Sequence, residues 1–221
     1  NGSWNFAFDD ENIGFAKGNN LGIRYARKKL GAQYIFVVNN DTIFTDPQYF
    51  DRLLAHCGPK TGIIRSNIRL TDGSIFQEGW LDLCYPWVLR KYLDYFFIVH
   101  GMEKYNGKIP HNRNKALKTK ILSGCALLFT PEFFRHYKGF YPRTFLYCEE
   151  AILCLMCERY GLEQVKVEDT EIYHKEDQSS EKSFGNAKSV KVKYQLKSYK
   201  YVIWNWMKTR LVQKIRRKLH A

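Results

Sequence analysis

A polar tripeptide, Asn39-Asn40-Asp41, is the first place in this sequence where metal chemistry is expected. It follows Gln33–Val38 (QYIFVV), a short apolar run typical of a buried central strand. In open α/β sheets, ligands bind at the edge where such strands end. A hard divalent cation at that edge takes carboxylate oxygen, which Asp41 can supply. The alternative is an Asx turn that caps the strand and binds nothing.

A glycine-rich stretch, Gly14–Gly22, is the candidate for phosphate binding. It leads into a helical pattern that continues to about Leu30, where Gly31 is a plausible C-cap. Backbone N–H groups at the start of a helix can face a phosphate. A flexible turn with asparagine caps is an equally good interpretation.

Two adjacent carboxylates, Glu149 and Glu150, begin the helical pattern Glu149–Tyr160. Acidic residues are favoured there by the helix dipole alone, so a structural role is the simpler interpretation. The functional interpretation is that one of them is a general base, which removes a proton from an attacking hydroxyl. His174 ends a short strand-like run and can complete a metal site, although a lone histidine is more often structural.

Strand and helix patterns alternate along the part of the chain that must position these residues. Strands are expected at Gln33–Val38, Gly62–Ser66, Lys120–Thr130, Val165–Val167 and Ile172–Tyr173. A helix is expected to begin with Asp46 as N-cap and Pro47 at its first position, and another at Pro131. This alternation predicts an α/β domain with a mostly parallel sheet and helices on both faces. Residues 79–118 are interpreted as an aromatic-rich insertion over the edge of the sheet.

The positive charge of this chain is concentrated in its tail. The net charge of the 221 residues is +13. Residues 182–221 contain 12 Lys or Arg and no Asp or Glu, so residues 1–181 carry only about +1 (13 − 12). No apolar run is long enough to span a bilayer. The six cysteines show no paired CxxC pattern, which favours reduced, buried thiols in a cytoplasmic protein. A zinc site made by Cys148, Cys154, Cys157 and His174 is the lesser alternative.

Taken together, five segments resemble glycosyltransferase family 2, in particular its bacterial rhamnosyltransferase-like and galactofuranosyltransferase-like branch. The segments are Glu11–Ile23, Tyr34–Thr42, Leu122–Phe134, Gly139–Leu155 and Glu171–Ser180. The resemblance implies a GT-A type, Rossmann-like nucleotide-sugar-binding fold and an inverting, metal-dependent sugar transfer. It implies that Asp41 and His174 bind Mg²⁺ or Mn²⁺, and that Glu150, beside Glu149, is the catalytic base. The donor-binding residues that it implies are Gly14, Phe15, Ala16, Lys17, Gly18, Asn19, Asn20, Asn39, Asn40, Ser123 and Gly124.

The sequence departs from the family pattern in two respects. The family often has an Asp and an Arg where this chain has Ile152 and Met156, which puts acceptor handling in doubt. The first strand, first helix and second strand of the family fold are expected to be missing upstream of Asn1, roughly 50–80 residues, judged from a βαβ unit with its connections.

The basic tail is predicted to be an amphipathic helix. Its apolar residues recur at steps of three or four. They are Trp204, Met207, Leu211, Ile215 and Leu219. Residues 1–181 are therefore expected to form the catalytic domain, and residues 182–221 a helical extension that binds an anionic membrane surface at the cytoplasmic face. The alternative for the tail is a solvated helix packed on the domain.

The function expected from the sequence is hexosyl or rhamnosyl transfer from a nucleotide-diphosphate donor to a glycan or lipid-linked acceptor, in surface polysaccharide synthesis. A non-catalytic sugar-nucleotide-binding member of the same fold is the second hypothesis. A nucleic-acid-binding protein is the third, and it rests on charge alone. The donor sugar, the acceptor and the oligomeric state, including a homo-oligomer, are left open.

Overall fold

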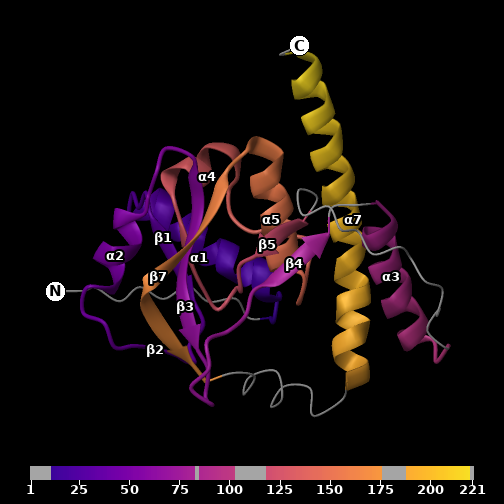
Figure 1. Cartoon of the computed structure of the whole chain (residues 1–221), viewed down its shortest axis with the longest axis horizontal. Helices are drawn as coiled ribbons and strands as arrows, with labels where there is room; N and C mark the ends of the chain where they lie inside the picture. Colours follow the sequence, from indigo (N-terminus) through magenta and orange to yellow (C-terminus); the bar gives the residue numbers. More distant parts are fainter. Residues whose placement is uncertain (1–10, 83–84, 103–117, 176–187, 220–221) are drawn as a thin grey trace.

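The computed structural model describes residues 11–82, 85–102, 118–175 and 188–219. Its centre is a five-stranded sheet with the order β1-β6-β3-β7-β2 (Figure 1). The strands are β1 (Ile35–Val38), β2 (Thr42–Phe44), β3 (Thr61–Arg69), β6 (Ala126–Phe129) and β7 (Glu163–His174). A second sheet contains β4 (Gly79–Asp82) and β5 (Lys118–Ile121), which pair antiparallel.

The expected α/β class is confirmed, but the expectation of a mostly parallel sheet is wrong. Among the described residues, β3 and β7 pair parallel, whereas β1–β6, β3–β6 and β2–β7 pair antiparallel. A parallel pair needs a crossover of a dozen residues or more. The predicted strand at Lys120–Thr130 is interrupted at Leu122–Cys125, and its second half becomes β6, which lies between β1 and β3 and runs opposite to both. The alternation of elements in the sequence did not reveal this reversal.

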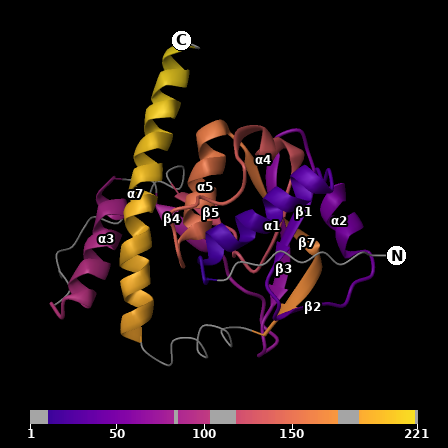
Figure 2. The same cartoon turned by 180° about the vertical axis from the view of Figure 1, so that it is seen from behind.

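Helices cover both faces of the sheet, as expected. Alternate side chains of one strand point to opposite faces, and the core divides accordingly. Ile63, Leu127 and Phe129 belong to the larger cluster, together with residues of α1 (Phe15–Lys29), α4 (Pro131–His136) and α5 (Glu149–Tyr160). Ile64, Ala126 and Leu128 belong to the smaller cluster, which is covered by α2 (Tyr49–Ala55). The view from behind shows α1, α4 and α5 on the near face (Figure 2).

The ends of these helices follow from local chemistry. The helix α1 includes the glycine-rich stretch that was expected to precede it, except Gly14, which is its N-cap. The helix ends at Lys29 with Leu30 as C-cap, and the next residue, Gly31, has a φ of 67°, the left-handed conformation common just after a helix. The helix α4 begins as predicted, with Pro131 in its first turn and the Thr130 hydroxyl accepting from the Phe133 amide. The helix α2 begins two residues later than expected, because Asp46 forms a turn in which its carboxylate accepts from the Gln48 amide (2.9 Å).

Beside the main sheet lie α3 (Tyr85–Val99) and α7 (Lys188–Leu219). The long helix α7 packs against α3 and α5, and its C-terminal end extends past the body of the molecule (Figure 1). The predicted tail helix is therefore present, and it is docked along part of its length. Within the residues that the structure describes, no helix is both long and apolar enough to cross a membrane.

Candidate active site

The β2–β7 pairing brings Asp41 and His174 together. Thr42, the first residue of β2, is paired with His174, the last residue of β7, and the Lys175 amide donates to the Asp41 carbonyl (3.1 Å). Asp41 Oδ1 lies 3.2 Å from His174 Nε2, and the two side chains are 17% and 15% exposed. Both atoms are buried, and neither has a hydrogen-bond partner among the described residues. Two residues 133 positions apart in the sequence thus form one half-buried polar pair.

This pair fits a divalent cation as two of its ligands. A carboxylate oxygen and an imidazole nitrogen are both common metal ligands in proteins, and buried polar atoms without hydrogen bonds need some other partner. The described part of the chain contains no cluster of three His, Cys, Asp or Glu side chains suited to a metal. The remaining ligands would therefore be water or the oxygens of a bound phosphate, an arrangement that Mg²⁺ commonly adopts.

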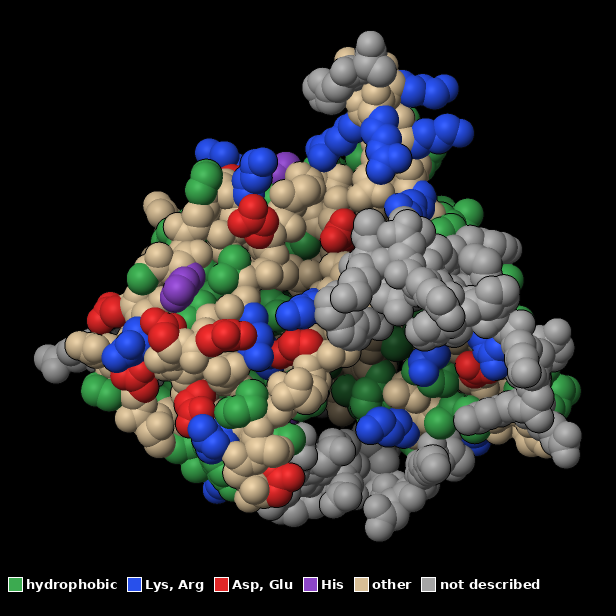
Figure 3. Space-filling view, in the orientation of Figure 1, with side chains coloured by type: hydrophobic (Ala, Val, Ile, Leu, Met, Phe, Trp, Pro, Cys, Tyr) green, Lys and Arg blue, Asp and Glu red, His purple; other side chains and the backbone are tan. Residues whose placement is uncertain are grey.

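Glu150 lies in a cavity of about 680 Å³ beside the sheet. The cavity is lined by residues of β4, β5, α3, α5 and α7, and Figure 3 shows a hollow in this region. Its lining includes four aromatic side chains and two residues expected at the site. The aromatic side chains are those of Phe76, Tyr95, Tyr147 and Tyr199. The expected residues are Glu150 and Ser123. A mostly apolar, aromatic wall with a few polar groups is typical of small-molecule sites.

The turn that delivers Glu150 is strained. Tyr147 and Cys148 both have φ of 69°, a left-handed conformation that costs a non-glycine residue on the order of 1–3 kcal/mol. Two such residues in succession, directly before the predicted helix Glu149–Tyr160, place both carboxylates at the helix start. Strain of this kind is concentrated at functional sites because the surrounding structure must maintain it.

Burial makes both carboxylates weaker acids than usual. Burial, reinforced by the neighbouring charge of Glu150, raises the pKa of Glu149 from 4.5 to about 7. Burial also raises the pKa of Glu150, although the amides of Glu150 and Gly124 partly oppose this. A carboxylate whose pKa moves toward neutrality is a better proton acceptor at physiological pH.

Gly124 and Cys125 lie between the Asp41–His174 pair and the cavity. A Cβ atom at Gly124 would lie 2.7 Å from Glu150 Oε1, so the glycine makes room for the carboxylate. The Cys125 carbonyl accepts from the Asn39 amide (2.8 Å), which ties this segment to the Asn39-Asn40-Asp41 turn. The charges of Asp41 and Glu150 both help to raise the pKa of the Cys125 thiol to about 11, although burial is the larger cause. Cys125 is therefore within electrostatic range of both carboxylates. Asp41 and His174 are not among the residues that line the Glu150 cavity.

The glycine-rich helix start is largely occupied by contacts within the protein. Gly14 has φ of 86°, its amide donates to Asn12 (3.0 Å), and the Phe15 amide donates to the Phe145 carbonyl (2.8 Å). Asn20 bonds the backbone of Phe140 through both its amide nitrogen and its oxygen (2.8 and 2.7 Å).

Four further residues of this stretch were expected to bind donor. Ala16 is fully buried, Lys17 and Gly18 are exposed, and Asn19 donates to the Phe15 carbonyl (3.0 Å). Through these contacts the glycine-rich stretch holds the loop before α5 in place. Donor binding by this stretch stays a prediction.

The two departures from the family pattern are core residues. Ile152 is fully buried and Met156 is 4% exposed, both in the larger cluster. Their apolar character is therefore explained by packing. Cys154 and Cys157 are free, buried thiols, and Cys148 is free and half-buried.

An ion pair beneath the site was not anticipated. Arg65 is fully buried in β3 and pairs with Glu78, whose side chain is 5% exposed. Burial lowers the pKa of Arg65 to about 10, and the positive charge of Arg65 partly opposes the rise in the pKa of the Cys125 thiol. The available signal was an arginine directly after Ile63 and Ile64, within the predicted strand Gly62–Ser66, because arginine is rarely buried unless it is paired.

In comparisons with known proteins, no protein-family model matches this chain, and no curated protein matches it.

Proposed function

We propose that this chain is the catalytic part of a glycosyltransferase with a GT-A type fold, which transfers a sugar from a nucleotide-diphosphate donor to an acceptor hydroxyl. The observation that carries the proposal is the convergence of distant residues on the Gly124-Cys125 segment. The half-buried Asp41–His174 pair lies on one side of it, and Glu150, a carboxylate of raised pKa, lies in a cavity on the other. An acid–base group beside a cation site is what transfer from a diphosphate requires.

Asp41 and His174 would hold the divalent cation, which would neutralise charge on the departing diphosphate. Glu150 would accept the proton of the acceptor hydroxyl. The acceptor oxygen would form a bond to the anomeric carbon while the bond from that carbon to the diphosphate oxygen breaks. The diphosphate would leave with both bonding electrons, and the sugar would be transferred with inversion. The aromatic wall supplied by Tyr95, Tyr147 and Tyr199 would pack against the apolar faces of the sugar or acceptor.

The test is donor hydrolysis and transfer in the presence of Mn²⁺, measured on the whole protein with any upstream segment included. Asp41→Ala and His174→Ala should weaken Mn²⁺ binding by at least roughly tenfold, since even changes outside the ligand shell have effects of that size. Glu150→Gln should abolish turnover while leaving Mn²⁺ binding intact. Activity of Asp41→Ala and Glu150→Gln equal to that of wild type would refute catalysis at this site. Donor binding without turnover in wild type would favour the accessory, sugar-nucleotide-binding role.

We also propose that α7 attaches the protein to an anionic membrane surface, at the cytoplasmic face. Its outer side carries an exposed apolar row, 47–76% exposed, consisting of Trp204, Met207, Leu211, Ile215 and Leu219. The opposite side, with Val202, Asn205 and Thr209, is buried against the body. The helix contains 11 Lys or Arg and no carboxylate, and Figure 3 shows cationic side chains around its projecting end. Apolar residues flanked by cations suit an anionic leaflet.

A further inference from the structure

A second cavity, of about 910 Å³, is lined by residues of α1, the helix that Figure 2 shows on its near face. It is bounded by α1, the loop of residues 137–142, the C-terminal end of α5 and the middle of α7, and we call it the α1–α7 groove. Seven of its lining side chains are cationic, and none is acidic. The cationic residues are Lys17, Arg24, Arg27, Lys28, Lys138, Arg159 and Lys208.

The charges on α1 are arranged to face this groove. At 100° per residue, Lys17, Arg24 and Lys28 lie within about 40° of one another on the helix surface, whereas Lys29 lies about 100° away from Lys28. Among the described residues, none of the seven groove cations forms an ion pair with a carboxylate. Like charges gathered in a cleft repel each other and focus a strong positive potential, so the groove is unfavourable until an anion neutralises it.

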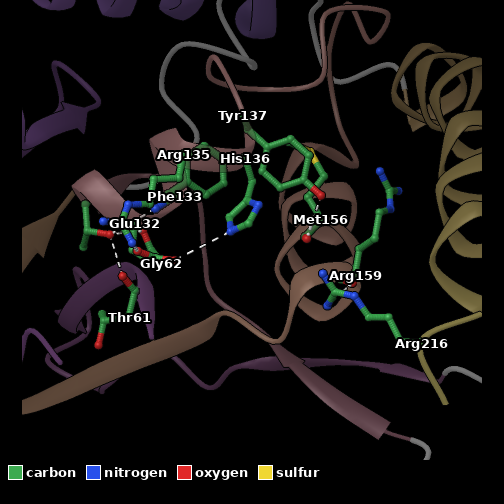
Figure 4. Close-up of polar contacts among 11 residues, drawn as sticks. Thr61, Gly62, Glu132, Phe133, Arg135, His136, Tyr137, Met156, Arg159 and Arg216 are labelled. Carbon is green, nitrogen blue, oxygen red and sulfur yellow. Dashed lines mark hydrogen bonds and ion pairs between the residues drawn. The ribbon is translucent and has the colours of Figure 1, made fainter. Parts of the chain in front are cut away.

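Arg159 provides a second, independent indication. It is 9% exposed, and its Nη2 donates to the side chain and the carbonyl of Asn205 (2.9 and 3.2 Å). Its Nε is buried and has no hydrogen-bond partner in the part of the chain that the structure describes. A buried guanidinium N–H without a partner is costly. Figure 4 shows Arg159 at the end of α5, near Met156, whose carbonyl accepts from Tyr137 Oη (2.9 Å).

The groove also has apolar walls and adjoins the exposed row of α7. Leu21, Phe140 and Met156 contribute to its lining. At the α7 side of the groove, the ammonium of Lys208 lies 5.0 Å from the centre of the Trp204 ring. The Trp204 side chain is 47% exposed. Lys208 thus belongs both to the groove and to the surface that we propose contacts the membrane. The ligand should accordingly combine phosphate charge with an apolar or sugar part.

We propose that the α1–α7 groove is a binding site for phosphate groups carrying two or more negative charges, such as a diphosphate or a phosphate monoester. One guanidinium group can bind two phosphate oxygens at once. The groove contains three guanidinium groups, those of Arg24, Arg27 and Arg159. The volume exceeds what a diphosphate fills, so the group attached to the phosphate also enters. This site is separate from the Asp41–His174 pair and holds its anion without a metal ion.

The test measures binding of the full chain to two probes, in buffer with a chelator and in the Asp41→Ala background, so that the candidate active site does not contribute. One probe is inorganic pyrophosphate, measured by calorimetry. The other is phosphatidylcholine vesicles containing phosphatidic acid, compared with vesicles containing phosphatidylserine at equal charge. The groove variant is Arg24→Glu/Lys28→Glu. Its control, Lys29→Glu/Lys60→Glu, makes the same change in net charge at exposed residues outside the groove.

The groove variant should weaken binding of at least one phosphate probe by roughly tenfold or more, since hydrogen bonds to charged groups have that effect. The control should stay within about twofold. Loss of pyrophosphate binding identifies a soluble phosphate ligand, whereas loss confined to phosphatidic acid vesicles identifies a lipid headgroup. Equal losses in the groove variant and the control, or no binding of either probe by the protein, would overturn the proposal. Because neither probe requires turnover, this result is independent of the outcome for Glu150.

Discussion

Replacing Glu149 by Gln should make the protein more stable at alkaline pH, although it removes a polar group from a buried position. Glu149 is 5% exposed, its Oε1 has no hydrogen-bond partner among the described residues, and its pKa is raised from 4.5 to about 7. Between these two values the unfolded chain releases a proton that the folded protein keeps. Stability therefore falls as pH rises through this window.

The shift of about 2.5 units (7 − 4.5) sets the magnitude. At 1.36 kcal/mol per unit, the ionised carboxylate costs the folded state about 3 kcal/mol once the pH is above 7. Glutamine has nearly the same shape and does not ionise. The free energy of unfolding of Glu149→Gln should therefore exceed that of wild type by less than about 1 kcal/mol at about pH 5 and by about 3 kcal/mol at about pH 8.

Urea unfolding followed by circular dichroism, at several pH values across this window, measures the difference. Glu163→Gln is the matched control, because its side chain is exposed at the start of β7. Its difference from wild type should be small and constant with pH. If the advantage of Glu149→Gln does not grow between about pH 5 and pH 8, Glu149 is already ionised and compensated in the folded protein, and the argument from burial is wrong.

Three further changes test the site and the helices around it. Gly124→Ala places a Cβ atom 2.7 Å from Glu150 Oε1 and should lower kcat by at least about tenfold with little change in Tm, because displacing a reacting group by about an ångström lowers the rate that much. An unchanged kcat would show that the Glu150 carboxylate is not used in the reaction. Asn205→Ala removes the 2.9 Å hydrogen bond from the buried Arg159 to the Asn205 side chain and should lower the free energy of unfolding by about 1.5–3 kcal/mol. An unchanged free energy of unfolding would show that water replaces the Asn205 side chain as the partner of Arg159. Trp204→Ser/Leu211→Ser/Ile215→Ser should reduce cosedimentation with anionic vesicles by at least roughly tenfold without lowering Tm. The control Leu30→Ser/Leu54→Ser should leave cosedimentation unchanged. Salt-sensitive binding of the wild-type protein to DNA, in place of binding to vesicles, would favour the nucleic-acid hypothesis.

The sequence predicted individual elements well because their signals are local. The helix at Glu149–Tyr160, the Pro131 helix start and the strand before Asn39 all depend on caps and apolar periodicity within a few residues. Strand direction depends instead on pairing between distant segments. Nothing within Ala126–Phe129 indicates that this strand lies between β1 and β3 and runs against both. Strands at Val165–Val167 and Ile172–Tyr173 were predicted separately, and they are one strand with an irregularity between them.

The candidate site was predictable in part. The residue types alone offered Asp41 and His174 as possible metal ligands, and the resemblance paired them; the β2–β7 register accounts for their meeting physically. Asn20 was expected to bind donor, but its amide bonds the Phe140 backbone, a contact across 120 residues that no local pattern indicates. The α1–α7 groove was missed for a different reason. A net charge near +1 over residues 1–181 hides a cluster of cations when acidic residues lie elsewhere on the surface.

The helices α5 and α7 relate the two sites to one another. Glu150 lines the candidate active cavity at the start of α5, and Arg159 lines the groove near its end. Nine residues at 1.5 Å each separate them by about 14 Å along the helix axis. A phosphate bound beside Arg159 is thus too far from Glu150 to be the leaving group of the proposed transfer. The phosphate proposed for the groove would therefore differ from that leaving group. The helix α7 reaches both sites, because Gln195 and Tyr199 line the cavity and Lys208 lines the groove. Loss of groove binding should therefore change KM for a phosphate-bearing acceptor and leave kcat unaltered.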